Sequence, residues 1–458
     1  MIKQTNQTAV VVGASLAGLL VARVLVDHFD QVTLLERDVF PAAGANRKGV
    51  PQGQHIHVLL ERGRRIMEKY LPGLTADLNR QGVANIVDVG LSVRWFSNGA
   101  YLQPGKSGLS SVGVARPTLE STIRRHVLAL PNVQALEDHD VIGLVTNADK
   151  TRVTGVRAID RRADRVEKTL KADLVIDAGG RGSRGPAWLE ELGYERPSEE
   201  TVAIGFSYTT CYYRRQPDRP ASIKGIACAP APPHKRLGIM LAQDGNRWVV
   251  TQGAYLGDQV STDYREFLEA VRQLPTPDIY NVIKNAEPLG KPVTNKFPSN
   301  LRRHYERLTR FPQDYVVIGD ALCSFNPIYG QGMTVAALET EAFEEWLITD
   351  REQLARRFFA KASQIIDGSW NAAISNDLRY SEVEGPRPLP RRFLNWYLGK
   401  VLRAAHHDAQ VTIAFLKVTN MIAPPPSLLQ PRIVWRVLKG NLRSGERDIG
   451  ARQAVMER

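Results

Sequence analysis

The chain has 458 residues, a formal net charge of +12 and 43% hydrophobic residues. With 24% charged and 7% aromatic residues, its composition excludes an intrinsically disordered chain, a collagen-like repeat and a small disulfide-stabilised domain. Its three cysteines, Cys211, Cys228 and Cys323, are too few for a disulfide framework and fit no zinc-binding spacing. We therefore expect a cytoplasmic protein without a metal site.

The first predicted elements are a strand, a helix and a second strand. Residues 8–13 (TAVVVG) form a β-branched run, residues 15–29 place leucine and valine at helical spacing, and residues 31–36 (QVTLLE) form another strand-like run. The largely apolar stretch 8–26 is interrupted by Arg23 and two glycines, and no small-residue cleavage site follows it. We interpret it as a buried strand and helix, not as a membrane span or a signal. This order predicts parallel strands.

The remaining elements are expected in alternating blocks. Alternation of apolar and polar residues predicts strands within 201–257, with a hairpin turn at Asp244-Gly245. The other predicted elements are a loop over 41–53, helices over 54–70 and 117–130, short antiparallel strands within 141–176, a strand over 315–318 and a helix over 333–350. Most of the remainder is predicted to be helical, with breaks at the prolines of 386–390 and 424–426.

The first motif with chemical meaning is Gly13-Ala-Ser15-Leu-Ala-Gly18, between the first strand and the helix. In a dinucleotide-binding fold the first glycine makes the tight turn, the last lets helix and strand pack closely, and the pyrophosphate rests on the helix N-terminus. Ser15 replaces the second glycine, and its hydroxyl can itself donate to phosphate. Glu36 ends the next strand, where an acid can accept from ribose hydroxyls. An ordinary strand–helix turn is the alternative, but the complete strand–helix–strand arrangement favours nucleotide binding.

Two later motifs also follow predicted strands. Asp177-Ala-Gly179-Gly180-Arg181 is a glycine-rich turn that lets the backbone approach a ligand, although by itself it is equally typical of a plain loop. The other motif joins Gly319-Asp320 to Asn326-Pro327-Ile-Tyr-Gly330-Gln331-Gly332-Met333 and leads into a helix. Asp320 can accept hydrogen bonds from a sugar-alcohol chain, and the N–H groups of 330–332 can stabilise a negative charge. The alternative here is a capped helix after a core strand.

In this order and spacing the three motifs resemble the FAD-dependent monooxygenases of the aromatic-hydroxylase and squalene-epoxidase type. The resemblance is closest to bacterial flavin epoxidases and hydroxylases of natural-product pathways. It covers residues 8–345, and a looser pattern extends to 415–431. It implies an α/β fold in which a Rossmann-like, three-layer FAD-binding domain of the glutathione-reductase type is interleaved with a β-sheet substrate domain. The implied segments are 1–185 (FAD-binding, with a small antiparallel insertion), 186–300 (mainly β, substrate), 301–350 (strand and helix that complete the FAD-binding domain) and 351–458 (helical).

The resemblance also implies which residues hold the cofactor FAD. The implied contacts are Gly13, Ser15, Leu16, Ala17 and Gly18 for the pyrophosphate, Glu36 beside Arg37 for the adenosine ribose, Val141 for the adenine, Arg116 for the phosphates or ribityl chain, Asp320 for the ribityl hydroxyls, and Pro327, Gly330, Gln331, Gly332 and Met333 for the isoalloxazine ring. No catalytic acid or base is assigned.

The implied activity is the insertion of one oxygen atom of O2 into a lipophilic small molecule through a flavin C4a-hydroperoxide. The substrate would be a terpenoid, polyketide or aromatic natural product, which is epoxidised or hydroxylated, and NADH or NADPH is the expected electron donor. A reductase or dehydrogenase of prenyl-type substrates and a flavin halogenase are alternatives on the same fold. The halogenases' usual Trp-x-Trp-x-Ile-Pro motif is absent, since no two of the seven tryptophans are separated by a single residue. Many aromatic hydroxylases have Asp-Gly where this chain has Gly179-Gly180, which moves the resemblance towards epoxidases and prenyl reductases.

Other residues are weaker candidates for contact with the substrate or the flavin. Each also has an ordinary structural interpretation, as a helix cap, a packing group or a solvated side chain. These candidates are His55 and His57 in the segment 50–57, which resembles a loop near the flavin, the tyrosines Tyr208, Tyr212, Tyr213 and Tyr255, Asn326 beside the flavin, and the group Arg302, Arg303 and Tyr305, which would pair with phosphate or face solvent.

Positive charge is concentrated near the C-terminus, where residues 351–458 contain 18 Lys and Arg against 9 Asp and Glu. Such a surface can meet nucleic acid, an anionic membrane or an acidic partner. No nucleic-acid motif accompanies the charge, so we expect no nucleic-acid partner and favour solvated helices. Peripheral membrane contact stays open, as does a non-catalytic, FAD-stabilised scaffold, although the intact motif at 327–333 argues against the scaffold.

Overall fold

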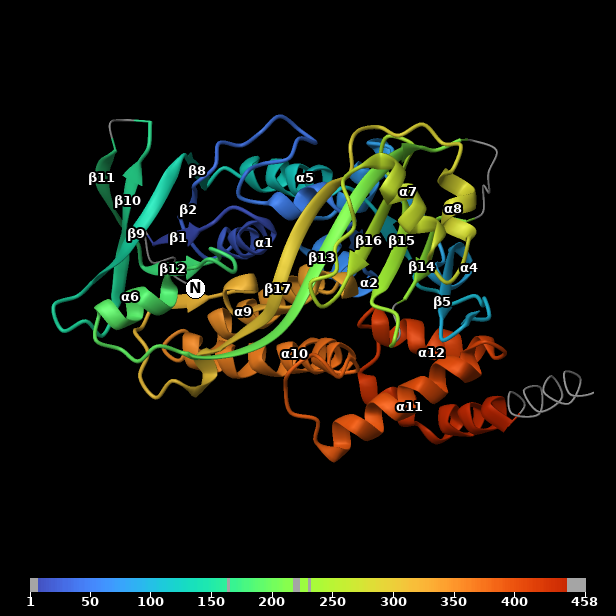
Figure 1. The fold of residues 1–458 in the computed structure, drawn as a ribbon. Helices are drawn as coiled ribbons and strands as arrows, with labels where there is room; N and C mark the ends of the chain where they lie inside the picture. Colours follow the sequence, from blue (N-terminus) through green and yellow to red (C-terminus); the bar gives the residue numbers. More distant parts are fainter. Residues whose placement is uncertain (1–6, 163–164, 217–222, 230–231, 443–458) are drawn as a thin grey trace, which may run out of the picture.

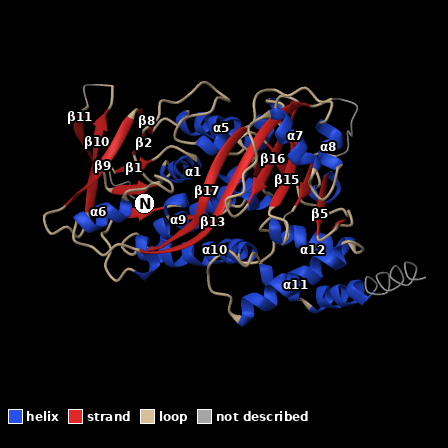
Figure 2. Cartoon of the chain, in the orientation of Figure 1, coloured by secondary structure: helices blue, strands red, loops and turns tan. Residues whose placement is uncertain are grey.

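The computed structural model describes residues 7–162, 165–216, 223–229 and 232–442. Within these ranges the strands form a five-stranded sheet, an eight-stranded sheet and two three-stranded sheets. Helices lie against the sheets and gather at the C-terminal end of the chain (Figure 1 and Figure 2). The expected α/β class is therefore confirmed.

The five-stranded sheet is parallel and has the order β18–β12–β1–β2–β8. Its strands are β1 (Thr8–Val12), β2 (Gln31–Glu36), β8 (Val133–Glu137), β12 (Leu174–Asp177) and β18 (Tyr315–Val317). The β-branched and leucine residues of β1 and β2 are almost entirely buried, as expected for strands covered on both faces. Because neighbouring strands run in parallel, the C-terminal ends of β1, β12 and β18 meet at one edge of the sheet. Each of the three glycine-containing motifs begins at one of these ends.

The eight-stranded sheet has the order β19–β17–β13–β16–β15–β14–β5–β6. Its strands are β5 (Val93–Ser97), β6 (Ala100–Tyr101), β13 (Ser198–Arg214), β14 (Gly225–Cys228), β15 (Arg236–Gln243), β16 (Arg247–Ala254), β17 (Val293–His304) and β19 (Cys323–Ser324). The long antiparallel strands β13 and β17 extend from the parallel sheet across the molecule (Figure 1). The hairpin β15–β16 turns at Asp244-Gly245, as predicted.

Two small sheets complete the strand inventory of the described residues. The antiparallel strands expected within 141–176 form the meander β9 (His139–Thr146), β10 (Val153–Asp160) and β11 (Val166–Lys171). The other small sheet consists of β3 (Val58–Leu59), β4 (Ala84–Ile86) and β7 (Ser111–Gly113).

Helices make up much of the rest of the described chain. They are α1 (Leu16–Leu25), α2 (Glu61–Tyr70), α3 (Leu74–Arg80), α4 (Val89–Ser92), α5 (Arg116–Leu128), α6 (Gly185–Glu191), α7 (Tyr264–Arg272), α8 (Asp278–Ile283), α9 (Gly332–Thr349), α10 (Leu354–Asp377), α11 (Leu389–Ala405) and α12 (Ala409–Thr419), and residues 431–442 are also helical. Short 3-10 turns are η1 (Pro51–Gln54), η2 (Tyr305–Arg307), η3 (Gly319–Ala321), η4 (Pro327–Tyr329) and η5 (Pro425–Leu429). None of the helices within the described residues has the length and apolarity needed to cross a bilayer.

The predicted helix over 54–70 was too long, because only its second half is helical. Residues 51–54 form η1, and Val58 and Leu59 pair instead with β7, so α2 begins at Glu61. This segment is fixed by contacts with distant residues, which local helical spacing does not register. The proposed domain boundaries remain a prediction; β17 runs across the boundary at 300, and β5 and β6 join the eight-stranded sheet from within 1–185.

Candidate functional site

The three glycine-containing motifs touch one another at the edge of the parallel sheet. Gly13 has φ +96°, and a Cβ there would lie 2.6 Å from the Ala178 carbonyl oxygen at the end of β12. A Cβ on Gly18 would lie 1.8 Å from the carbonyl oxygen of Gly13. At Gly319, where φ is +72°, a Cβ would come within 2.8 Å of the Ala17 Cβ. The absence of side chains therefore lets the turn after β1 approach both neighbouring strand ends.

Asp320 follows Gly319, the glycine that contacts Ala17. Its side chain is accessible to solvent, yet protein atoms surround it closely enough that burial raises the pKa of its carboxyl. The positive charges of Arg116 and Arg181 oppose this rise. Arg181 Nη2 donates to Ser299 Oγ at 2.9 Å. Its Nη1 is buried and has no hydrogen-bond partner among the described residues, which leaves a donor for an anionic or hydroxylated ligand.

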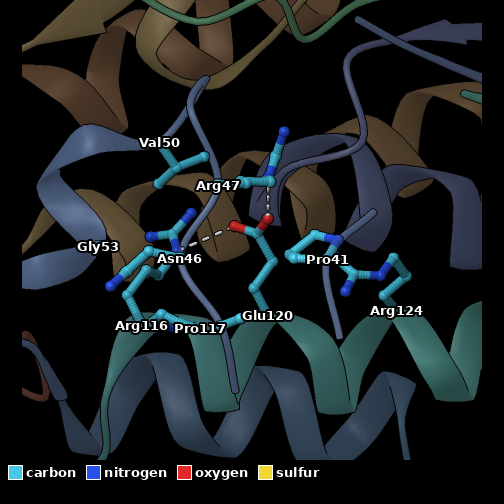
Figure 3. A pocket seen from close by; sticks show the side chains of 10 residues that line it. Pro41, Asn46, Arg47, Val50, Gly53, Arg116, Pro117, Glu120 and Arg124 are labelled. Atoms are coloured by element: carbon cyan, nitrogen blue, oxygen red, sulfur yellow. Dashed lines mark hydrogen bonds and ion pairs between the residues drawn. The ribbon is translucent and has the colours of Figure 1, made fainter. Parts of the chain in front are cut away.

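Ser15, at the start of α1, belongs to a charged cluster with Arg116, Glu120 and Arg47. Figure 3 shows the last three side chains. Its hydroxyl donates to Glu120 Oε2 at 2.9 Å and accepts from Arg116 Nη2 at 3.0 Å, and it does not cap its own helix. Arg116 Nε also donates to Glu120 at 3.1 Å. On the other side of Glu120, Arg47 Nε donates to Oε1 at 2.8 Å. Arg116 thus reaches the expected phosphate-binding turn.

Arg47 connects this cluster to the end of β2. Its Nη1 lies 3.0 Å from Glu36 Oε1 and 3.2 Å from Asp38 Oδ2. Glu36 in turn accepts from the backbone N–H of Ala14 at 2.9 Å. The sequence placed Arg47 in a plain loop, because its role depends on three carboxylates that only the fold brings together. The pocket beside it, drawn in Figure 3, is lined by Pro41, Ala45, Asn46, Arg47, Val50, Gly53, Arg116, Pro117, Glu120 and Arg124.

The residues expected to hold the adenosine lie at the same end of the sheet. Arg37 is exposed, and its carbonyl oxygen accepts from Arg161 Nη1 at 3.0 Å. Val141 is half-buried on β9, packs against the main core, and pairs with Ala158 of β10. The hydrogen bond from Arg161, which follows β10, to Arg37 joins the meander to the segment after β2.

The segment expected to flank the flavin ring is η4 together with the start of α9. Pro327 and Gly332 are exposed, and Gly330 has φ +64°, the left-handed conformation that ends η4. The Gly330 Cβ position lies 3.5 Å from Val58 Cγ1. The segment that includes His55 and His57 therefore does pass this loop. Met333 is buried, and the Oε1 of Gln331 is buried without a partner among the described residues.

A buried carboxylate, that of Asp377, is hydrogen-bonded to this loop. Asp377, at the end of α10, accepts from Tyr255 OH at 3.1 Å, Asn326 Nδ2 at 3.1 Å and Tyr329 OH at 3.2 Å through Oδ1, and from Asn300 Nδ2 at 2.9 Å through Oδ2. Burial raises the pKa of Asp377 despite these four donors. Asn326 is therefore a structural link rather than an exposed group. Sequence patterns did not reveal Asp377, since it lies 51 residues beyond Asn326.

The two histidines are neutral groups with structural partners. His55 Nδ1 contacts Thr210 Oγ1 at 2.8 Å, and its ring meets Tyr208 edge-on at a centroid distance of 4.4 Å. Burial lowers the pKa of His55 to about 4. Burial and the nearby charge of Arg116 lower the pKa of His57 to about 3. Neither histidine supplies a positive charge at neutral pH.

The four candidate tyrosines have different surroundings. Tyr208 and Tyr255 both pack against Phe206, at centroid distances of 5.8 and 4.8 Å. Tyr212 donates to the Gln54 carbonyl oxygen at 3.2 Å. Tyr213 points to the opposite face of β13, into a separate core beneath α7 and α8, because side chains alternate along a strand. Tyr208 and Tyr255 therefore share the side of the sheet that faces Asn326, and Tyr213 does not.

Arg302, Arg303 and Tyr305 do not behave as expected, because all three are buried and no phosphate-facing or solvated role applies. Arg303 donates to the carbonyl oxygens of Ala321 at 3.0 Å and Arg181 at 3.1 Å, so it ties two motifs together. Arg302 pairs with Asp367 at 2.6 Å on α10. Tyr305 stacks on Phe359 at 5.3 Å.

Together these features fit a bound FAD. The glycine contacts leave a backbone-lined cradle at the N-terminus of α1, where an anionic pyrophosphate is favoured. Glu36 and Asp320 offer carboxylate oxygens at two separate points of this edge, and the unpaired Nη1 of Arg181 offers a donor. A long ligand that alternates hydroxyl and phosphate groups matches this order of donors and acceptors.

A sequence profile described as FAD binding domain matches residues 6–344. The chain belongs to this FAD-binding family. The match spans all three motifs, so the resemblance expected from the sequence is confirmed and FAD is the cofactor. The chain is also 32% identical over 454 residues to Protein Rv3254 of Mycobacterium tuberculosis, covering 95% of this chain and 94% of that protein.

Solved structures with the same fold include flavoproteins of several kinds. A flavoprotein/dehydrogenase from Cytophaga hutchinsonii has a TM-score of 0.66 at 15% identity, over 96% of this chain and 100% of that one. The p-nitrophenol 4-monooxygenase PnpA from Pseudomonas putida has a TM-score of 0.62 at 15% identity, over 90% and 99%. The flavin-dependent brominase Bmp2 has a TM-score of 0.63 at 14% identity, over 91% and 94%. At identities of 14–15%, these similarities show a shared fold and nothing more.

Proposed function

We propose that this FAD-binding protein is a monooxygenase that transfers one oxygen atom of O2 to a lipophilic small molecule, by epoxidation or hydroxylation. The observation that carries the proposal is the position of the Pro327–Gly332 loop. It follows Asp320 in the chain, and Asn326 at its start donates to the hydroxyl of Tyr255, which packs against Phe206 of the eight-stranded sheet. When bound, the flavin supplies the activation of O2 and the transfer of oxygen.

The chain's own residues would bind and orient both partners of the reaction. We assign the phosphates to Arg116 and to the backbone at Ser15, whose hydroxyl proton is donated to Glu120. We assign the ribityl hydroxyls to Asp320, and the negative charge of the reduced ring to the N–H groups at the start of α9. Asp377 holds Asn326 and Tyr329, and thereby the loop, in one conformation. The assignment of each of these groups follows its position at the sheet edge.

The substrate side would exclude water and carry little charge. Phe206, Tyr208 and Tyr255 form a buried aromatic cluster, and His55 beside Tyr208 is neutral because burial lowers its pKa to about 4. An environment of this kind would suit an apolar terpenoid, polyketide or aromatic substrate. We further propose NADH or NADPH as the reductant and the cytoplasm as the location, where the three buried free cysteines would stay reduced.

The test is to mix dithionite-reduced, FAD-loaded protein rapidly with air-saturated buffer and to follow the flavin absorbance. The apolar alkene squalene and the arene 4-nitrophenol serve as probes. We expect reoxidation in two phases, with a transient spectrum unlike those of reduced and oxidised FAD, and 18O from 18O2 in any product. Single-phase return to oxidised FAD with every probe would overturn the monooxygenase assignment.

A reductase of prenyl-type substrates is the second candidate. It is favoured by Gly179-Gly180, which stand where many aromatic hydroxylases have Asp-Gly. This candidate predicts anaerobic reoxidation of the reduced flavin by geranylgeraniol, without O2. A flavin halogenase, as for the brominase of similar fold, is less well supported, because no Trp-x-Trp pair occurs in the chain.

A further inference from the structure

The C-terminal helices carry most of the exposed apolar side chains of the molecule. Of the fourteen large hydrophobic residues exposed in the described part of the chain, eight lie between 389 and 442. These are Leu389, Phe393, Leu394 and Trp396 on α11, Leu429 in η5, and Trp435, Leu438 and Leu442 on the helix 431–442. Trp396 and Trp435 are 58% and 69% exposed. Both helices lie at the outer edge of the molecule, away from the parallel sheet (Figure 1).

Apart from Leu429 in η5, these side chains lie on the solvent-facing sides of α11 and of the helix 431–442. Leu389, Phe393 and Trp396 recur at the i, i+4, i+7 spacing of one helix face, and Trp435, Leu438 and Leu442 recur at i, i+3, i+7. The helices meet at Asn441, whose Nδ2 donates to the Lys400 carbonyl oxygen at 2.9 Å. Their other faces bury Val401, Leu402 and Val437 in a separate core. Contacts on the buried faces therefore hold both helices in place, and the exposed side chains are not needed for this packing.

The same region is strongly basic. Between residues 387 and 442 the sequence has nine Lys and Arg but a single acid, Asp408. Asp408 caps α12 and pairs with Arg436 at 2.8 Å. The basic groups are interleaved with the aromatic ones, as shown by Lys400 Nζ, 5.8 Å from the Trp396 ring. Exposed tryptophan, phenylalanine and leucine beside unopposed Lys and Arg are typical of a segment that lies in a membrane interface.

We propose that this C-terminal face, formed by the exposed residues of α11, η5 and 431–442, binds peripherally to an anionic lipid bilayer. The apolar side chains would enter the headgroup region, and the Lys and Arg residues would meet lipid phosphates. A second copy of the chain is a poorer occupant, because a two-fold contact would place like charges against each other. The proposal does not depend on the oxygen chemistry, although a lipophilic substrate would be present in the same bilayer.

The test uses the full-length, FAD-loaded protein and vesicle flotation. Vesicles of phosphatidylcholine alone are compared with vesicles containing about 30% phosphatidylglycerol, at 50 and 500 mM NaCl. We expect binding to the anionic vesicles at low salt and weaker binding at high salt. Binding to neither vesicle type, or equal binding to both, would overturn the proposal.

Matched variants locate the surface. Trp396→Ser/Trp435→Ser should lower the partition coefficient about tenfold, whereas Ile348→Ser, which removes a 60% exposed apolar side chain from α9, should not. Arg392→Gln/Lys439→Gln should lower it about tenfold, and Lys171→Gln/Lys291→Gln, which removes exposed charges elsewhere, should have little effect. FAD content should be unchanged in all four variants, which separates this proposal from the proposed function.

Three further outcomes would overturn the proposal. A dimer that the tryptophan variant converts to a monomer would indicate self-association. Binding to poly-glutamate at the same salt without vesicle binding would indicate an acidic protein partner. Equal loss of vesicle binding in the control variants would show that the C-terminal face is not the binding surface.

Discussion

The side-chain amide of Asn326 donates to the carboxylate of Asp377 at a distance of 3.1 Å, so the loop expected at the flavin ring is bonded to the end of α10. Tyr329 of the same loop reaches the same oxygen at 3.2 Å. The C-terminal helical region is therefore part of the support of the cofactor site. Its contribution is an acceptor buried among four donors.

Removing this acceptor should destabilise the protein. Asp377→Ala leaves Asn300, Asn326 and two tyrosines without their common partner, which should lower the free energy of unfolding by about 2–4 kcal/mol. Asn371→Ala, at an exposed position of the same helix, should change it by less than about 0.5 kcal/mol. Thermal unfolding of both FAD-loaded variants measures the difference. Equal melting temperatures would show that the network adds no stability.

Asp320 should be needed for tight FAD binding. Asp320→Ala removes a charged acceptor, and a hydrogen bond to a charged group contributes about 1.5–3 kcal/mol. The Kd of the apoprotein for FAD should therefore rise about 10- to 100-fold, as measured by flavin fluorescence titration. The Kd of Asp320→Asn, which keeps one acceptor oxygen, should lie between those of the wild type and Asp320→Ala. Full flavin occupancy in the alanine variant would contradict the ribityl assignment.

Gly18 and Gly368 should respond in opposite directions to the same change. A Cβ on Gly18 would lie 1.8 Å from the Gly13 carbonyl oxygen, whereas a Cβ on Gly368, within α10, meets nothing within 4 Å. Gly18→Ala should therefore yield little soluble flavoprotein. Gly368→Ala should raise the stability by about 0.5–1 kcal/mol through its helix propensity. Yellow, soluble Gly18→Ala protein would argue against close packing of this turn.

Glu339 should make stability depend on pH. Burial raises its pKa to about 8, and its Oε2 accepts from the Gly319 N–H at 2.7 Å. Because the folded-state pKa lies above the unfolded value of 4.5, its contribution is fully present below about pH 4.5 and is lost as the pH rises through 8. Relative to Glu339→Gln, the wild-type melting temperature should fall between pH 5 and 8.5. A constant difference across this range would show that the fold does not raise the pKa of Glu339.

The sequence predicted the parts of the site that depend on neighbouring residues. Gly13, Gly18 and Asp320 could be found because each follows a β-branched strand, and strand ends of a parallel sheet collect at one edge. The hairpin at Asp244-Gly245 was found for a similarly local reason. In these places the local backbone preference and the tertiary fold agree.

Other parts of the site depend on residues that are distant in the sequence. Arg47 has no local pattern, because Glu36 and Glu120 flank it only after folding. Asp377 and Arg303 likewise act through bonds to remote backbone and side chains. The helix expected from residue 54 fails for the same reason, since strand pairing with β7 overrides its helical spacing. Periodicity detects which face of an element is buried, but not what covers it.

The meeting of β1, β12 and β18 has a consequence for biosynthesis. These strands begin at residues 8, 174 and 315. The third strand of the expected FAD site is therefore missing until more than two-thirds of the chain has been synthesised. A nascent chain therefore has its phosphate turn long before it has Asp320. Cofactor capture is a late event, and a ligand that binds only the finished arrangement stabilises every long-range pairing at once. FAD would then stabilise the folded state only of chains whose synthesis has passed residue 320.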